Sequence, residues 1–151
     1  DASLFADLVI EEIQNDQDFK KSEVLELARF ADNLFDDQEA ALDIFQYAQR
    51  MDGELKDNDQ MYFGLLILDR YERLVSNVSK EQSFATSQGK PREEWPKIEE
   101  PTARKELIQA LDLLASAYET MARLDEEAGD QMAGILRSKL FLLKRVLAPE
   151  K

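Results

Sequence analysis

The chain has 151 residues, of which 44% are hydrophobic and 34% are charged, and its formal net charge at pH 7 is −13. A chain of this length can bury a sizeable core within one domain. It contains no cysteine and no histidine, which excludes disulfide frameworks, thiolate chemistry and imidazole, the usual general base and metal ligand. The acidic balance also disfavours nucleic acid as a partner, because the protein would repel the phosphate backbone.

The charge is unevenly distributed along the chain. Residues 1–76 carry 19 acidic and 7 basic side chains, a net charge of −12, whereas residues 77–151 carry 13 and 12, a net charge of −1. From Gln131 onward five basic residues stand against one glutamate. The sequence therefore predicts an acidic first half and a basic last helix.

Two helices are predicted before residue 36 from the spacing of apolar residues. The first runs from about Ser3 to Gln14. The second begins near Ser22, a residue suited to an N-cap. Their apolar faces are predicted to comprise Phe5, Val9 and Ile13 in the first, and Val24, Leu27, Ala28, Ala31, Leu34 and Phe35 in the second.

The third predicted helix carries the clearest apolar stripe of the chain. Asp36 followed by Glu39 resembles a capping box at its start, and Gly53 is suited to end it. Residues at successive helical spacings between these ends are apolar, which predicts one buried face. The stripe comprises Ala41, Ile44, Phe45, Ala48 and Met51.

A fourth helix is predicted over residues 59–78 and is apolar nearly all round in its first half, which is typical of a central helix. Gly64 within it indicates close approach of another helix, because glycine otherwise weakens a helix. Residues 79–101 lose the helical period and are predicted to form a loop. Within this loop we expect Trp95 and Ile98 to fold back onto the helices; the alternative is that Trp95 is an exposed anchor for a partner.

The last two helices are predicted from Pro101 or Thr102 to about Glu127, and from a cap at Asp130 to Pro149, with Gly129 ending the first of them. No segment shows the alternation of a strand. We therefore predict an all-α fold of about six helices in a single domain, residues 1–151. It comprises a helical block at 1–78, a loop at 79–101 and a helical block at 102–148.

Residues 22–53 resemble one tetratricopeptide-type helical hairpin. Ala41, Phe45 and Ala48 stand at the intervals of small, aromatic and small residues in the second helix of that family. Val24, Leu27 and Ala28 fit the pattern of its first helix. The resemblance covers about 34 residues, its connection is one residue too long, and Gly53 replaces the usual proline. It implies antiparallel hairpins packed as a tetratricopeptide-like array, with an irregular helical bundle as the alternative.

Several acidic patterns approach catalytic or metal-binding motifs, and each departs from its motif. Glu23 and Glu26 match half of the Mg²⁺-binding pattern of all-α nucleoside triphosphate pyrophosphatases, but Asp69 and Glu72 reverse the other half. The sequence DDQEA at 36–40 is explained better by helix capping than by prenyl-diphosphate chemistry. The segment 52–63 resembles a calcium loop in composition only, since Phe63 stands where a glutamate should bind the ion. We therefore expect a protein without catalytic activity, metal or cofactor.

The remaining prediction is a helical protein–protein interaction module: an adaptor, chaperone or scaffold subunit that binds a basic or amphipathic-helical segment. Alternatives are an acidic antidote that covers a basic site of a partner enzyme and, with least support, a metal-dependent nucleotide pyrophosphatase. Self-association stays open. The predicted partner-binding residues are Asp32, Asp36, Asp37, Asp43, Asp52, Glu54, Asp57 and Asp59.

The longest apolar run, residues 61–68, is far shorter than the roughly 20 residues of a membrane-spanning helix. A soluble protein is therefore expected. The cytoplasm is slightly favoured, and an exported mature form is an alternative because the sequence begins at Asp1.

Overall fold

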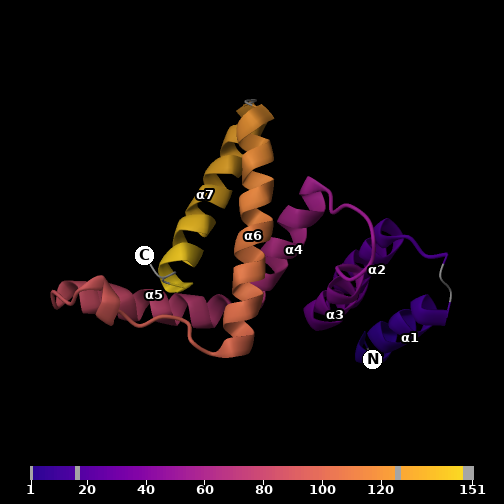
Figure 1. The fold of residues 1–151 in the computed structure, drawn as a ribbon, viewed down its shortest axis with the longest axis horizontal. Coiled ribbons are helices and arrows are strands. Elements are labelled where there is room, and N and C mark those ends of the chain that lie inside the picture. Colours follow the sequence, from indigo (N-terminus) through magenta and orange to yellow (C-terminus); the bar gives the residue numbers. More distant parts are fainter. Residues whose placement is uncertain (1, 16–17, 125–126, 148–151) are drawn as a thin grey trace. The chain divides into compact units, whose positions relative to one another are not determined.

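A computed structural model describes residues 2–15, 18–124 and 127–147. Over these ranges the chain forms seven α-helices, one 3₁₀ turn and no β-strand, which confirms the all-α prediction (Figure 1). The chain divides into two compact units, Asp1–Asp59 and Gln60–Lys151. We call them the N-terminal and C-terminal units. The boundary falls inside a helix and not in the predicted loop, while the single-domain assignment stays a prediction.

In the N-terminal unit, α3 (Gln38–Ala48) packs against both α2 (Lys21–Phe35) and α1 (Ala2–Asn15). The predicted stripe of α3 is confirmed, because Ala41, Ile44, Phe45 and Ala48 are all fully buried. Alanines on the facing helix allow close packing around the Phe45 ring. Those alanines of α2 are Ala28 and Ala31, both fully buried.

The ends of these helices differ from the prediction. Helix α2 begins at Lys21, not at Ser22, because the Glu23 carboxylate accepts a hydrogen bond from the Lys20 backbone N–H at 3.0 Å and satisfies the first turn. Helix α3 is capped by Asp37, whose Oδ1 accepts from Ala40 N at 2.9 Å. Asp36 instead ends α2 in the left-handed conformation, with φ 50°. The helix also ends at Ala48, so Gly53, with φ 132°, belongs to the next connection.

The predicted apolar face of α2 is correct in its first part and wrong at its end. Leu34 and Phe35 are 63% and 47% exposed. Leu34 lies four residues after Phe30, so it falls on the same outer side as that residue and away from the buried alanines. Ile13 of α1 is buried as predicted, whereas the side chain of Phe5 lies outside the described residues.

The C-terminal unit begins within α4 (Asp57–Arg70), and α5 (Glu72–Ser87) follows after a break at Tyr71. The prediction of one helix over 59–78 and a loop from residue 79 is therefore wrong. The loop is shorter, and it contains the 3₁₀ turn at Arg92–Glu94. Polar residues such as Lys80 and Glu81 interrupt the apolar pattern of α5, so its helical period was not recognised in the sequence. The buried face of α5 comprises Val75, Val78, Gln82 and Ala85.

Helix α6 (Pro101–Leu124) starts where predicted and packs along α7 (Glu127–Leu147), which also contacts α5. Because α7 already begins at Glu127, Gly129 and Asp130 lie inside it and not at a turn. Gly64 of α4 does mark a close approach: a Cβ atom there would lie 2.8 Å from Leu114 Cγ of α6. Leu107, Leu114, Leu136 and Leu143 are fully buried in this core.

The loop between α5 and α6 folds back as expected. Ile98 is buried, and its backbone N–H donates to the Val146 carbonyl of α7 at 2.9 Å. Trp95 is half-buried, and its indole N–H donates to the Lys90 carbonyl at 3.0 Å. The indole is thus held against its own loop, while a role of Trp95 as an anchor for a partner stays untested.

Among the described helices, none combines the length and the apolar character that crossing a membrane would need.

Candidate protein-docking surface

All eight acidic residues predicted to bind a partner belong to the N-terminal unit. They occur on α2, in the turn between α2 and α3, on α3, in the connection to α4 and in the first turn of α4. Five are exposed and therefore available at the surface. These five are Asp36, Asp43, Asp52, Glu54 and Asp57.

The other three acids are less accessible. Asp59 is buried, and its carboxylate forms an ion pair with Arg29 of α2. Asp59 therefore forms an internal ion pair, and its predicted role in partner binding stays a prediction. Asp37 is half-buried and caps α3, and Asp32 is half-buried on α2. The accessible part of the predicted site is thus smaller than the sequence indicated.

The net negative charge falls within a shorter stretch than the first half of the sequence, namely the N-terminal unit. Residues 1–59 carry 17 acidic and 5 basic side chains, a net charge of −12, and residues 60–151 carry 15 and 14, a net charge of −1. Nearly all of the formal charge therefore belongs to the smaller unit. Such a concentration of one sign raises the local concentration of ligands of the opposite sign.

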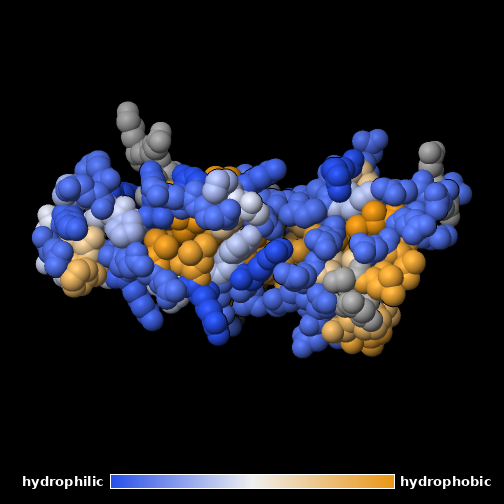
Figure 2. Space-filling view, turned by 90° about the horizontal axis from the view of Figure 1, so that it is seen from below, coloured by the Kyte–Doolittle hydropathy of each residue, from blue (hydrophilic) through white to orange (hydrophobic). Residues whose placement is uncertain are grey.

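The same unit exposes large apolar side chains that sequence reasoning missed. Phe30, Leu34 and Phe35, which we call the α2 apolar stripe, are 45%, 63% and 47% exposed. The rings of Phe30 and Phe35 meet edge to face with centroids 5.9 Å apart. Figure 2 shows hydrophobic side chains exposed over this unit and bordered by hydrophilic ones. On α1, Leu4 and Leu8 are also exposed.

A depression of about 360 Å³ adjoins the stripe. It is lined by Glu26, Arg29, Phe30, Asn33 and Leu34, so an apolar floor is bordered by an exposed carboxylate. Phe30 and Leu34 are four residues apart, as are Leu4 and Leu8. This spacing, off the core face of each helix, is the sequence signal that predicts a second apolar face.

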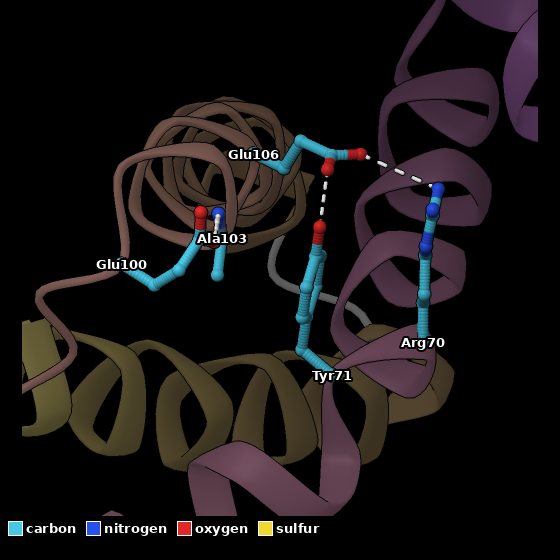
Figure 3. Close-up of polar contacts among 5 residues, drawn as sticks. All are labelled: Arg70, Tyr71, Glu100, Ala103 and Glu106. Carbon is cyan, nitrogen blue, oxygen red and sulfur yellow. Dashed lines mark hydrogen bonds and ion pairs between the residues drawn. The ribbon is translucent and has the colours of Figure 1, made fainter.

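The C-terminal unit contains a polar cluster around the break between α4 and α5 (Figure 3). The Tyr71 hydroxyl donates a hydrogen bond to Glu106 of α6, and Arg70 Nη1 lies 3.5 Å from Glu106 Oε1. Burial and the nearby Glu106 carboxylate raise the pKa of Tyr71 to about 12. A phenol with this pKa remains protonated near neutral pH, so it keeps its hydrogen bond to Glu106 and connects the start of α5 to α6.

The neighbouring Glu100 caps α6. Its carboxylate accepts backbone hydrogen bonds from Ala103 N at 2.6 Å and Thr102 N at 3.1 Å, and these bonds lower the pKa of Glu100 (Figure 3). The cap explains why α6 begins sharply after the loop.

The residues of the pyrophosphatase-like pattern belong to different units, Glu23 and Glu26 to the N-terminal unit and Asp69 and Glu72 to the C-terminal unit. Glu23 is already used in capping α2. Across the part of the chain that the structure describes, no three acidic side chains gather where they could hold a metal ion.

The hairpin of α2 and α3 has the buried alanines and phenylalanine on which the tetratricopeptide resemblance rests. Membership of that family stays a prediction. Comparison of the chain with protein-family models, with curated proteins and with solved structures gives no match.

Proposed function

We propose that this protein is a non-catalytic interaction module whose N-terminal unit binds a cationic amphipathic segment of another protein. The observation that carries the proposal is the presence of exposed apolar side chains in a unit with a net charge of −12. A purely acidic surface is explained by solubility alone. Exposed phenylalanines and leucines beside it require a further explanation, because each costs free energy in contact with water.

The two features have separate roles in binding. Burial of the α2 apolar stripe supplies most of the affinity, at roughly 1.5–3 kcal/mol for each large side chain that is fully covered. The exposed acidic residues of the same unit contribute about 0–1 kcal/mol each as exposed pairs. Their summed field accelerates association with a basic segment. The acidic residues therefore select a positively charged segment, and the α2 apolar stripe determines most of the affinity.

A synthetic amphipathic helix with leucine on one face and lysine on the other tests the proposal. The labelled peptide is titrated with the full chain at low protein concentration, and binding is followed by fluorescence anisotropy. We expect saturable binding that weakens as the salt concentration rises from about 50 to about 500 mM, mainly through slower association. A matched peptide with glutamate in place of lysine should not bind. Equal binding of both peptides would contradict the proposal.

Two sets of variants separate the roles. Replacing Phe30 and Leu34 by alanine should weaken binding of the lysine peptide by at least about tenfold, or roughly 1.4 kcal/mol. The same truncation at Phe84, which is 64% exposed on α5, is the control and should have little effect. Reversal of Asp43, Asp52 and Glu54 to lysine should slow association, whereas replacing Arg137, Lys144 and Arg145 by glutamine should not.

A further inference from the structure

The C-terminal unit presents a surface with the chemistry that the N-terminal unit is proposed to bind. On α7, Phe141 is 70% exposed. Arg137 lies one turn before it and Lys144 one turn after it, and both are exposed. Because residues three and four apart share one side of a helix, an aromatic ring here lies between two cations. We call Arg137, Phe141 and Lys144 the α7 basic face.

The α7 basic face is an unusual feature in a chain with a net charge of −13. Its ring is among the most exposed large apolar groups of the described residues. The face requires a partner that offers an apolar group for the ring and negative charge for the two cations. An acidic protein surface with its own apolar centre has both, and one such surface is the α2 apolar stripe of a second copy.

We propose that the α7 basic face of one copy docks on the α2 apolar stripe of another, so that the protein associates with itself. This inference rests on the proposed function, because it identifies the basic amphipathic segment as one that the chain itself carries. Phe141 is the anchor that enters the depression of about 360 Å³ beside Phe30 and Leu34. Arg137 and Lys144 then lie toward Glu26, the acid that lines the depression, while Arg29 in the same lining is already paired with Asp59. The contact matches apolar with apolar and positive with negative charge.

The contact is heterologous, since the two faces differ in composition. Such a contact joins copies either into a closed oligomer, in which every face is paired, or into an open filament that can add further copies. The apolar part of each face comprises only a few large side chains, so the interface belongs to the small class that gives weak, concentration-dependent association. The assembly should therefore dissociate on dilution.

Sedimentation analysis of the full chain over a range of protein and salt concentrations tests the inference. The average mass should rise above that of the 17.4 kDa monomer as the protein concentration increases in the micromolar range. It should return toward the monomer at high salt. Phe141→Ser should raise the dissociation constant by about tenfold or more, as expected for an anchor residue.

Charge exchange between the faces identifies the contact. The variant Arg137→Glu/Lys144→Glu and the variant Glu26→Lys/Asn33→Lys should each remain monomeric by themselves. Mixed together they should associate again, because each then offers a face complementary to the other. The variant Arg73→Glu/Lys105→Glu changes the charge equally at exposed positions of α5 and α6 and should associate like the unmodified chain. Circular dichroism confirms the fold of every variant.

Each outcome distinguishes the self-docking inference from the proposed function. A chain that stays monomeric but binds the lysine peptide overturns the inference alone. A chain that associates but shows no rescue in the mixture uses another surface, which also overturns it. If the mixed variants associate but the chain does not bind the lysine peptide, self-docking is supported and the proposed binding of segments from other proteins is contradicted. When both hold, excess peptide should dissociate the assembly, because the two compete for the α2 apolar stripe.

Discussion

The two units of this protein use their polar side chains in different ways. In the C-terminal unit they tie segments of backbone together inside the fold. Gln82 is fully buried, and its Nε2 donates to the carbonyls of Pro96 and Arg145 at 2.8 Å each. Arg104 Nη1 donates to the carbonyls of Ile98 and Leu147 at 2.9 and 2.8 Å. A single side chain thus joins the loop to α7 in each case.

The N-terminal unit has such tethers too, but most of the acids predicted to bind a partner are exposed at its surface. Lys21 Nζ donates to the Gly53 carbonyl at 3.3 Å, and Arg29 pairs with Asp59. Among its described residues, the core combines six buried alanines with larger side chains such as Phe45, Ile44 and Leu42. Buried polar side chains thus connect segments of backbone in the larger unit, whereas many acids of the smaller unit are exposed at its surface.

The largest effect is expected from Phe45→Ala, which removes a fully buried ring from the core of the N-terminal unit. The free energy of unfolding should fall by about 3–5 kcal/mol, as measured by urea denaturation and far-ultraviolet circular dichroism. The single tryptophan, Trp95, lies in the C-terminal unit. Its fluorescence transition should therefore move much less than the dichroism signal.

This pair of signals tests the comparison directly. A loss below about 1 kcal/mol would mean that Phe45 is not central to the core. An equal shift of the tryptophan transition would mean that the two units unfold together. Phe84→Ala, at an exposed position of α5, is the control and should change neither signal.

Gly64→Ala tests the C-terminal unit in the same way. A Cβ atom would lie 2.8 Å from Leu114 Cγ and 2.9 Å from Leu114 Cδ2, so α4 and α6 must separate or Leu114 must leave its rotamer. The expected loss is about 1–3 kcal/mol, and here Trp95 fluorescence should report it. Gly134→Ala is the matched control on α7, where the nearest atom is the flexible end of Arg137 at 3.9 Å. It should be neutral or stabilising by up to about 1 kcal/mol.

A smaller effect is expected from Asp37→Ala, which removes the cap of α3. The loss should be about 1 kcal/mol and should appear in the dichroism transition of the N-terminal unit. Asp36→Asn is the control, since asparagine tolerates the left-handed conformation at that position. A larger loss from Asp36→Asn than from Asp37→Ala would restore Asp36 as the capping residue.

The smallest effect concerns pH and Tyr71. Its pKa rises from 10.0 to about 12 on folding, so the protonated phenol is favoured in the folded state. The contribution is fully present below pH 10 and is lost as the pH rises from 10 toward 12, because the unfolded chain ionises first. Urea denaturation followed by Trp95 fluorescence should show this loss. Tyr71→Phe should flatten the pH dependence in this range, and an unchanged slope would contradict the assignment.

Much of the fold could be predicted because apolar residues that recur at helical spacing indicate which face of a helix is buried. The stripe of α3 and the start of α6 at Pro101 were identified from spacing alone. The second half of α5, residues 79–87, was missed for a physical reason. Its buried face includes Gln82, which is polar but donates to two backbone carbonyls. The break at Tyr71 was also missed. The Tyr71 hydroxyl there donates to Glu106, 35 residues away, and local spacing cannot show such a contact.

The candidate site was predicted in its charge but not in its apolar part. Acid counts give the sign of a surface directly from the sequence. Leu34 and Phe35 were assigned to the core because they are apolar and follow buried residues, yet both are about half exposed or more. Hydrophobicity does not say whether a helix has a partner on a given side. Asp59 shows the converse, since a carboxylate expected at the surface is buried against Arg29.

The loop between α5 and α6 has one further consequence, for how the chain tolerates cleavage and extension. Its second half is held by Ile98 N, Gln82 and Arg104, so a protease could bind there only after several of these bonds open. At the other end of the loop, a Cβ atom added to Gly89 would meet no other group within 4 Å. An added segment at Gly89 would leave the held half intact. We therefore expect the second half of the loop to resist proteolysis, and an insertion to be tolerated where it keeps the backbone of Gly89, whose φ is 74°.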